Sequence, residues 1–266
     1  MVELIAEIGW NHMGDMSLAE KMIKSAAESG ADYAKFQTWS VDRLKPGDWD
    51  TDGRRQIYEA AELTAEKHEH LIQLCKEYDI KFLSSVFSVE DAKFLRGFGV
   101  QEVKIPSFEC RNHDLIKYCD RNFEKIFMST GTSTWKEIKE SVSLIKDADL
   151  VLMHCVSSYP CEPRQANIFK IEKLKEICAQ VGYSDHIFGV ESAKVAMKYD
   201  VCVIEKHFTV DQGLPGRDNK FAILPSDLKN LKEYVTMFEE MHTWHGEDFL
   251  DIEEGSRENY TGRFDG

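Results

Sequence analysis

Short runs of β-branched and aromatic residues recur along this chain, and longer stretches with helical spacing of apolar residues separate them. Eight such runs are predicted to be strands, namely residues 3–8, 33–38, 81–86, 102–107, 125–130, 150–155, 182–186 and 201–209. Several are apolar almost throughout, which is typical of parallel strands buried on both faces. The run at 182–186 is too polar to be assigned from propensity alone.

Helices are expected between these strands. Ser17 and Thr134 are each followed three residues later by a glutamate, which is the spacing of a capping box at a helix start. Residues 64–78 carry apolar side chains at helical intervals, and a last long helix is expected over 226–241.

The regular alternation of strand and helix predicts the α/β class, with one (β/α)₈ barrel, a TIM barrel, over residues 1–243. An open doubly wound sheet would show a glycine-rich phosphate turn after its first strand, and this sequence has none there. The polar stretch 39–53 is expected to be a long loop at the active-site face. Residues 244–266 are predicted to be an acidic tail or part of a linker.

Composition limits the classes of partner. The formal net charge of −14 disfavours nucleic acid and acidic membranes, although a small anion could bind where a few cations gather in one pocket. No apolar run approaches the ~18 residues of a membrane span. The seven cysteines include no CxxC pair, and the N-terminus lacks the features of a signal peptide. We therefore expect reduced, mostly buried thiols and a cytoplasmic protein.

In such a barrel, side chains at the carboxyl ends of the strands converge on one mouth. Lys35 and Lys104 stand within otherwise apolar strands, where an unpaired charge is costly. With the hydroxyls of Ser85, Ser107, Ser129 and Ser184 they predict a small cationic site, suited to a compact phosphate and carboxylate. Lys206 is expected to point away from Glu205 and His207, as a surface lysine.

His186 and His207 end neighbouring predicted strands. Two such imidazoles can share one metal ion and leave positions for water and a substrate oxygen, or they can be hydrogen-bonded structural histidines. Glu109 follows Ser107 closely, where it can act as a general acid or base, or pair with a lysine. Asp218, on a loop after the last strand, can reach a polar substrate or remain solvated.

At these residues the chain resembles the sialic acid synthase family, which includes legionaminic, pseudaminic and spore-coat polysaccharide synthases. The matching motifs, in order, are Glu7-Ile-Gly-Trp-Asn-His-Met-Gly-Asp15, Lys35-Phe-Gln-Thr38, Phe82-Leu-Ser-Ser-Val-Phe87, Lys104-Ile-Pro-Ser-Phe-Glu109, Ser129-Thr-Gly131, His154-Cys-Val-Ser-Ser-Tyr-Pro160, Ser184-Asp-His186 and Glu205-Lys-His-Phe-Thr209. One short match would be chance, whereas eight in order, each at a strand end, are specific.

The resemblance implies a transferase that joins phosphoenolpyruvate to an N-acetylated sugar aldehyde, consuming water and releasing phosphate. It implies a divalent ion on His186 and His207, commonly Mn²⁺, with Mg²⁺ or Co²⁺ as alternatives. It places phosphoenolpyruvate on Lys35, Lys104, Ser85, Ser107, Ser129, Ser157 and Ser184. It makes Glu109 the acid/base, and it puts the sugar against Gln37, Tyr159, Glu7 and Asp218. It also implies a homodimer. The family's C-terminal antifreeze-like domain is expected to be missing from this sequence.

Two other functions remain open from the residues. One is a related 3-deoxy-sugar-acid phosphate synthase, which would act on a phosphorylated sugar and would need an extra basic cluster. The other is a catalytically idle barrel that binds a sugar or a partner protein.

Overall fold

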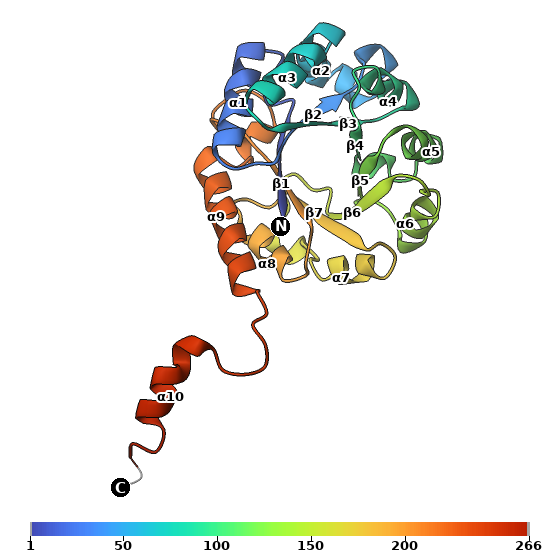
Figure 1. The fold of residues 1–266 in the computed structure, drawn as a ribbon. Coiled ribbons are helices and arrows are strands. Elements are labelled where there is room, and N and C mark those ends of the chain that lie inside the picture. The colour runs from blue at the N-terminus through green and yellow to red at the C-terminus, as the bar shows by residue number, and fades with distance from the viewer. Residues whose placement is uncertain (1, 265–266) are drawn as a thin grey trace.

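The computed structural model describes residues 2–264, and its centre is a closed barrel of eight strands in the order β1 to β8 (Figure 1). Every neighbouring pair, including β1 with β8, is parallel. The strands are β1 Glu3–Gly9, β2 Tyr33–Thr38, β3 Lys81–Val86, β4 Glu102–Ile105, β5 Lys125–Ser129, β6 Asp149–Cys155, β7 Gln180–Asp185 and β8 Val203–His207. The predicted (β/α)₈ barrel is confirmed.

Helices surround the strands and cover the outside of the barrel (Figure 1). They are α1 Met16–Glu28, α3 Ala65–Glu77, α4 Val89–Arg96, α5 His113–Asn122, α6 Trp135–Val142, α7 Lys170–Lys175, α8 Glu191–Met197 and α9 Pro225–Met241. An additional helix, α2 Arg54–Ala61, follows the long loop after β2, which itself contains the short 3₁₀ turns η1 Val41–Arg43 and η2 Asp48–Asp50. The sequence pattern had not indicated α2.

The ends of several elements differ from the predicted ones by a few residues. Strand β4 stops at Ile105 because Pro106 has no N–H to continue the ladder, and the turn η3 Ser107–Glu109 follows. The predicted capping box at Ser17 is wrong. Asp15 caps α1 instead, since its side chain accepts from the backbone N–H groups of Ser17 and Leu18. The capping box at Thr134 is confirmed.

The barrel interior has three levels. Apolar side chains form the middle one: Ile5, Tyr33, Leu83, Phe127, Val151, Met153 and Val203. Below them, at the amino ends of the strands, Glu3 pairs with Lys81 at 2.9 Å and with Lys125 at 3.1 Å. Above them, at the carboxyl ends, lies a second polar level that includes Lys35 and Lys104. The apolar level therefore separates two charged clusters at opposite ends of the barrel.

Alternate residues of each strand face outward, toward the helices. Lys206 does point away from Glu205 and His207, but the expectation of a surface lysine is wrong. It is buried between sheet and helix, where its Nζ lies 2.9 Å from Asp185 Oδ2 and donates to the carbonyl of Ile187. The pair satisfies both charges, as burial requires.

The chain after α9 leaves the barrel and carries the turn η6 Asp251–Glu253 and the helix α10 Glu254–Tyr260 (Figure 1). Its described side chains are exposed. The division at residue 243 stays a prediction. Over residues 2–264, none of the helices combines the length and apolar character that crossing a membrane requires.

Candidate active site

A cavity of about 990 Å³ opens at the carboxyl ends of the strands. Thirteen of the fourteen residues proposed from the sequence line it: Glu7, Lys35, Gln37, Ser85, Lys104, Ser107, Glu109, Ser129, Tyr159, Ser184, His186, His207 and Asp218. Ser157 lies just behind them, with its Oγ 3.9 Å from Cys155 Sγ. The fold thus gathers, around one space, residues that are spread over more than 200 positions of sequence.

Strand register explains why the floor of the cavity is charged. Glu7 pairs in register with Lys35 on one side and with His207 on the other, so the three side chains emerge at one level. Lys35 Nζ lies 2.7 Å from Glu7 Oε2 and donates to Ser85 Oγ at 2.9 Å. All of these side chains are almost fully buried.

Glu205 completes this floor. Its carboxylate accepts from Lys104 Nζ at 2.8 Å and from Ser184 Oγ at 2.9 Å, and it lies 3.9 Å from Lys35 Nζ. Burial alone would raise the pKa of Glu205, but Lys104 and Lys35 hold it well below its usual range. Burial raises the pKa of Glu7, although Lys35 opposes that effect. Glu205 is therefore the carboxylate that stays ionised, and Glu7 is the one that takes up a proton more easily.

The charge of the cavity differs in sign from that of the whole chain. Its lining includes six cationic side chains, Lys35, Arg43, Lys45, Lys104, Arg217 and Lys220, and four carboxylates, Glu7, Glu109, Glu205 and Asp218. With neutral histidines this is a balance of +2, against −14 for the protein. The cavity therefore meets the condition that composition set for an anionic ligand, namely cations gathered in one place.

Hydroxyl groups surround a glycine at one side of this floor. The backbone N–H of Gly131 donates to Ser107 Oγ at 3.2 Å, and a Cβ at this glycine would lie only 2.6 Å from the same oxygen. It would lie closer still to Ser157 Oγ. The Ser129 hydroxyl is buried and has no partner in the described part of the chain. This arrangement leaves hydroxyl donors available to an anion beside Lys104.

His186 and His207 lie side by side, with ring centroids 5.4 Å apart. Burial lowers the pKa of His207 to about 4, so its imidazole is neutral at pH 7 and able to bind a metal. Its Nδ1 has no hydrogen-bond partner among the described residues, and Asp218 Oδ2 is 3.7 Å away. Two neighbouring imidazoles with a carboxylate nearby fit a divalent ion that keeps open positions.

Within residues 2–264, no three side chains of His, Cys, Asp or Glu are grouped as a metal site.

Glu109 stands at the rim of the cavity on η3 and is half-buried. Its Oε2 accepts from Asn112 Nδ2 at 2.7 Å, while Asn112 Oδ1 accepts from the backbone N–H of Leu115 and so caps α5. Because the side-chain oxygen of Asn112 already accepts this backbone hydrogen bond, the side-chain nitrogen of Asn112 is the atom that faces Glu109. The carboxylate of Glu109 is thereby oriented, and within residues 2–264 it pairs with no lysine, contrary to the alternative that the sequence had left open.

Several polar residues near the predicted strand ends do not reach the cavity. His154 is buried on the outer face of β6, where its ring stacks on Tyr183 and its Nε2 bonds the carbonyl of Ala166 at 2.7 Å. Asp185 and Lys206 pair with each other behind the barrel wall. Strand alternation separates these residues from Ser184, His186 and His207, which face inward.

Sequence reasoning assigned no role in the site to two kinds of lining residue. Glu205 and Cys155 lie inside the quoted motifs. Side chains alternate between the two faces of a strand, so the outward direction of Lys206 and His154 could have indicated that Glu205 and Cys155 face the cavity. The other kind comes from loops and includes Trp10, Trp39 and Tyr58. No local periodicity marks these side chains, since their contacts depend on how the loops fold over the barrel.

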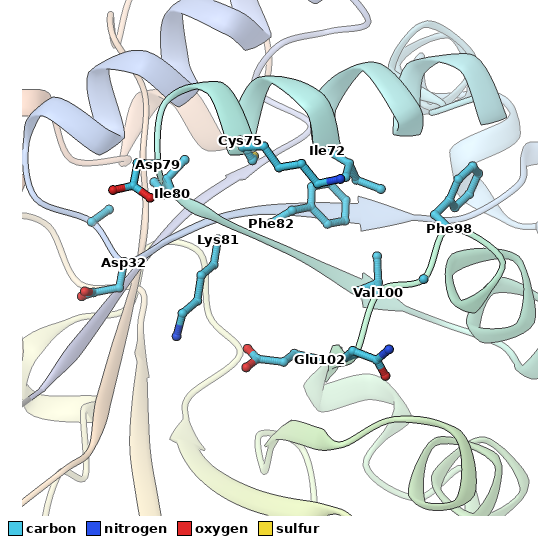
Figure 2. Close-up of a pocket in the computed structure, with 14 residues that line it drawn as sticks. Asp32, Ile72, Cys75, Asp79, Ile80, Lys81, Phe82, Phe98, Val100 and Glu102 are labelled. Carbon is cyan, nitrogen blue, oxygen red and sulfur yellow. The ribbon is translucent and has the colours of Figure 1, made fainter.

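A second cavity, of about 700 Å³, lies at the opposite end of the barrel under α3 (Figure 2). Lys81, the first residue of β3, stands at its edge together with Glu102 and Asp32. Lys81 pairs with Glu3, and Asp32 pairs with Lys232 at 3.3 Å. Polar groups at this end of a TIM barrel serve stability rather than catalysis, so the cavity at the carboxyl ends is the candidate active site.

Comparisons with known proteins agree with this assignment. The chain is 35% identical over 251 residues to an N,N'-diacetyllegionaminic acid synthase of Legionella pneumophila, covering 87% of this chain and 70% of the relative. It is 32% identical over 273 residues to a pseudaminic acid synthase of Campylobacter jejuni, covering 97% of this chain and 79% of that one.

Among solved structures, the N-acetylneuraminic acid synthetase of Leptospira borgpetersenii, determined with citrate, superposes with a TM-score of 0.87. The two share 29% sequence identity, and the match covers 99% of this chain and 92% of the other. The profile of the NeuB family matches residues 22–246. The barrel, the residues gathered at its mouth and these matches lead to one conclusion: the chain is a synthase-type enzyme that belongs to the NeuB family.

Proposed function

We propose that this enzyme condenses phosphoenolpyruvate with the aldehyde of an N-acetylated hexose-type sugar, forming a sialic-acid-like nonulosonic acid and releasing phosphate. The observation that carries the proposal is the pair of buried lysines, Lys35 and Lys104, set in a ring of serine hydroxyls beside His186 and His207. One mouth thus offers a site for a compact phosphorylated acid and, next to it, a site for a carbonyl oxygen.

Phosphoenolpyruvate would occupy the hydroxyl-rich side of the floor. Lys35 and Lys104 would face its charged groups, and the hydroxyl donors would come from Ser85, Ser107, Ser129, Ser157 and Ser184. Both lysines are already balanced by Glu7 and Glu205. The arriving anion would therefore bind a preorganised charge network and would not have to order two flexible side chains.

The sugar aldehyde would lie toward the histidines. His186 and His207 would hold a divalent ion, Mn²⁺ in preference to Mg²⁺ or Co²⁺, and such an ion polarises an aldehyde oxygen and makes its carbon more electrophilic. Glu7, Gln37, Tyr159 and Asp218 would contact the hydroxyls of the sugar. Gln37 Nε2 already donates to Glu7 Oε1 at 2.8 Å, so these two side chains present one polar surface.

The reaction balances with one water. C3 of phosphoenolpyruvate attacks the aldehyde carbon and forms the new C–C bond, the aldehyde oxygen takes a proton, and C2 becomes oxocarbenium-like. Water then adds to C2, and phosphate leaves from the resulting hemiketal. Glu109 would accept the proton of that water; its place in the cavity lining and the hydrogen bond that Asn112 donates to its Oε2 support this role.

A homodimer and a cytoplasmic location are part of the same proposal and rest on the family resemblance. All seven cysteines are free, as expected for a reducing compartment. The polarity of the barrel mouth supports an active enzyme over an idle sugar-binding barrel, because a binding module has no need of an oriented Glu109 beside buried lysines.

Phosphate release tests the proposal. Purified protein with Mn²⁺ and phosphoenolpyruvate is given N-acetylmannosamine, diacetamido hexoses, mannose or arabinose 5-phosphate. We expect release with a non-phosphorylated, N-acetylated sugar, and we expect Glu109→Gln to cut kcat by roughly 10²-fold while phosphoenolpyruvate still binds. Release only with the sugar phosphate would move the enzyme to the related phosphate synthases, and binding without release would favour the idle barrel.

A further inference from the structure

Asp185 and Lys206 form a buried charge pair behind the barrel wall, next to the proposed metal ligands. Their side chains are 0% and 3% exposed, and Lys206 Nζ lies 2.9 Å from Asp185 Oδ2. Asp185 directly precedes His186 along the chain, and Lys206 directly precedes His207. Because side chains alternate along a strand, the pair faces the helices while the two histidines face the cavity. The functions proposed for the cavity residues leave this pair without a role.

The backbone ladder between β7 and β8 ends at this pair. Asp185 and Lys206 are the last paired residues of the two strands, and His186 lies one position beyond the end of β7. His207 is held on its other side, where it pairs with Glu7 of β1. In the described part of the chain no strand pairing joins His186 to His207, so other contacts must set their separation.

Lys206 holds the chain on both sides of His186. Its Nζ donates to the side chain of Asp185 at 2.9 Å and to the carbonyl oxygen of Ile187. The backbone N–H of Ile187 in turn donates to Asp185 Oδ1 at 2.9 Å, which closes a tight turn around the histidine. One side chain of β8 therefore fixes where the end of β7 presents His186, and the next residue of β8 is His207.

The carboxylate of Asp185 is itself fixed by further donors. Tyr183 Oη donates to its Oδ1 at 3.1 Å, and Ser192 Oγ, on α8, donates to its Oδ2 at 2.5 Å. With the N–H of Ile187 and the ammonium group of Lys206, each carboxylate oxygen accepts two hydrogen bonds. A buried carboxylate that is satisfied in this way is rigid, so the position of Lys206 is determined as well.

Stability alone does not account for a charge pair of this kind. Taking two charges out of water is costly, and replacing a buried pair by neutral side chains is often neutral or stabilising. A metal site, in contrast, depends closely on the groups that orient its ligands, and changes to such groups typically weaken metal binding by about 10- to 100-fold. The place of the pair, at the end of the ladder and beside both histidines, fits this second requirement.

We propose that Lys206 and Asp185 are positioning residues that set the separation of His186 and His207, and thereby the affinity of the site for a divalent ion. This inference rests on the proposed function and deepens it. Neither residue is part of the cavity lining, so neither would contact the ion or a substrate. They would act through the backbone, by keeping the centroids of the two imidazole rings 5.4 Å apart.

The test removes the pair without leaving a buried charge unpaired. In the double variant Asp185→Asn with Lys206→Met, the amide oxygen can still accept from Tyr183 and Ile187, and the hydroxyl of Ser192 can accept from the amide nitrogen. The variant loses the hold of Lys206 on the carbonyl of Ile187. A change in metal affinity that is not accompanied by a change in stability then reports positioning.

The matched control is Asp32→Asn with Lys232→Met, which removes an ion pair of 3.3 Å at the opposite end of the barrel. Binding of Mn²⁺ alone to each purified protein is measured from the electron paramagnetic resonance signal of the free ion, and thermal melts check the fold. His207→Ala, which lacks one of the proposed ligands, gives the background.

We expect the double variant to bind Mn²⁺ about 10-fold more weakly than wild type, while the control stays within about 2-fold of wild type. An unchanged affinity in a double variant that melts like wild type, or an equal weakening in the control, would overturn the inference and leave the proposed function standing. If the double variant does not fold, Ser192→Ala, which removes one donor from Asp185, replaces it: a weakening of about 3-fold is expected, and an unchanged affinity overturns the inference. Wild type that binds Mn²⁺ no more tightly than His207→Ala would instead overturn the metal site of the proposed function.

Discussion

Replacing Gly131 by alanine is expected to weaken phosphoenolpyruvate binding strongly without unfolding the barrel. Because the glycine is not in a left-handed conformation, alanine meets no backbone strain there. The new methyl group would, however, lie 2.6 Å from Ser107 Oγ and 3.0 Å from Ser107 Cβ, and closer still to Ser157 Oγ. Carbon atoms do not approach that closely, so both serine side chains must move.

The size of the effect follows from the donors that are displaced. A hydrogen bond to a charged group contributes about 1.5–3 kcal/mol, and two such hydroxyls turned away from the phosphate would cost at least about 3 kcal/mol. That corresponds to a rise of roughly 10²-fold in KM for phosphoenolpyruvate. The KM for the sugar should change much less, since its proposed contacts lie on the other side of the cavity.

Steady-state phosphate release, with each substrate varied in turn, measures both constants, and a thermal melt checks the fold. Gly255→Ala is the control, because nothing lies within 4 Å of the position of its Cβ. Ser107→Ala should reproduce part of the Gly131→Ala effect. A Gly131→Ala enzyme whose KM for phosphoenolpyruvate stays within about three-fold of wild type would refute the reasoning that these hydroxyls hold the anion.

Three further outcomes are expected. Glu205→Gln should lower the free energy of unfolding by about 3 kcal/mol, because it leaves the buried Lys104 without its counter-ion, and an unchanged urea midpoint would contradict this. Burial lowers the pKa of His154 to about 4, so the unfolded chain takes up the proton first and stability is lost as pH falls from ~6.5 toward 4. Urea titrations at pH 7 and pH 5 measure this loss in the free energy of unfolding. His154→Gln should reduce the loss by about 2 kcal/mol, whereas His70→Gln, at an exposed histidine, should not. His207→Ala, like chelation of divalent metal, should abolish turnover, and full activity at limiting metal would exclude a ligand role for this residue.

The sequence by itself determined the barrel and most of its mouth. Buried strands repeat with a period of two, so Lys35 had to face the interior if its apolar neighbours Ala34 and Phe36 faced the helices. The same rule put His207 inside and Lys206 outside. Parallel strands in a closed barrel then bring all the carboxyl ends together, whatever their separation along the chain.

Other features depended on interactions that no local pattern encodes. Asp15, and not Ser17, caps α1 because the helix begins two residues earlier than the Ser17 motif predicted. The burial of Lys206 required Asp185 on the neighbouring strand to face the same way. The orientation of Glu109 required Asn112 to be committed already as a helix cap.

The aromatic side chains at one side of the active-site cavity show the physical reason for this division. Trp10, Trp39 and Tyr58 stand on separate loops and a helix, and their contacts exist only once β1, β2 and α2 are assembled. Periodicity reports how a side chain is directed from its own strand or helix. The direction of a loop, and the groups that two loops bring together, are decided by tertiary packing. The sequence therefore predicted the polar mouth of the barrel, and only the structure revealed the aromatic side of the cavity.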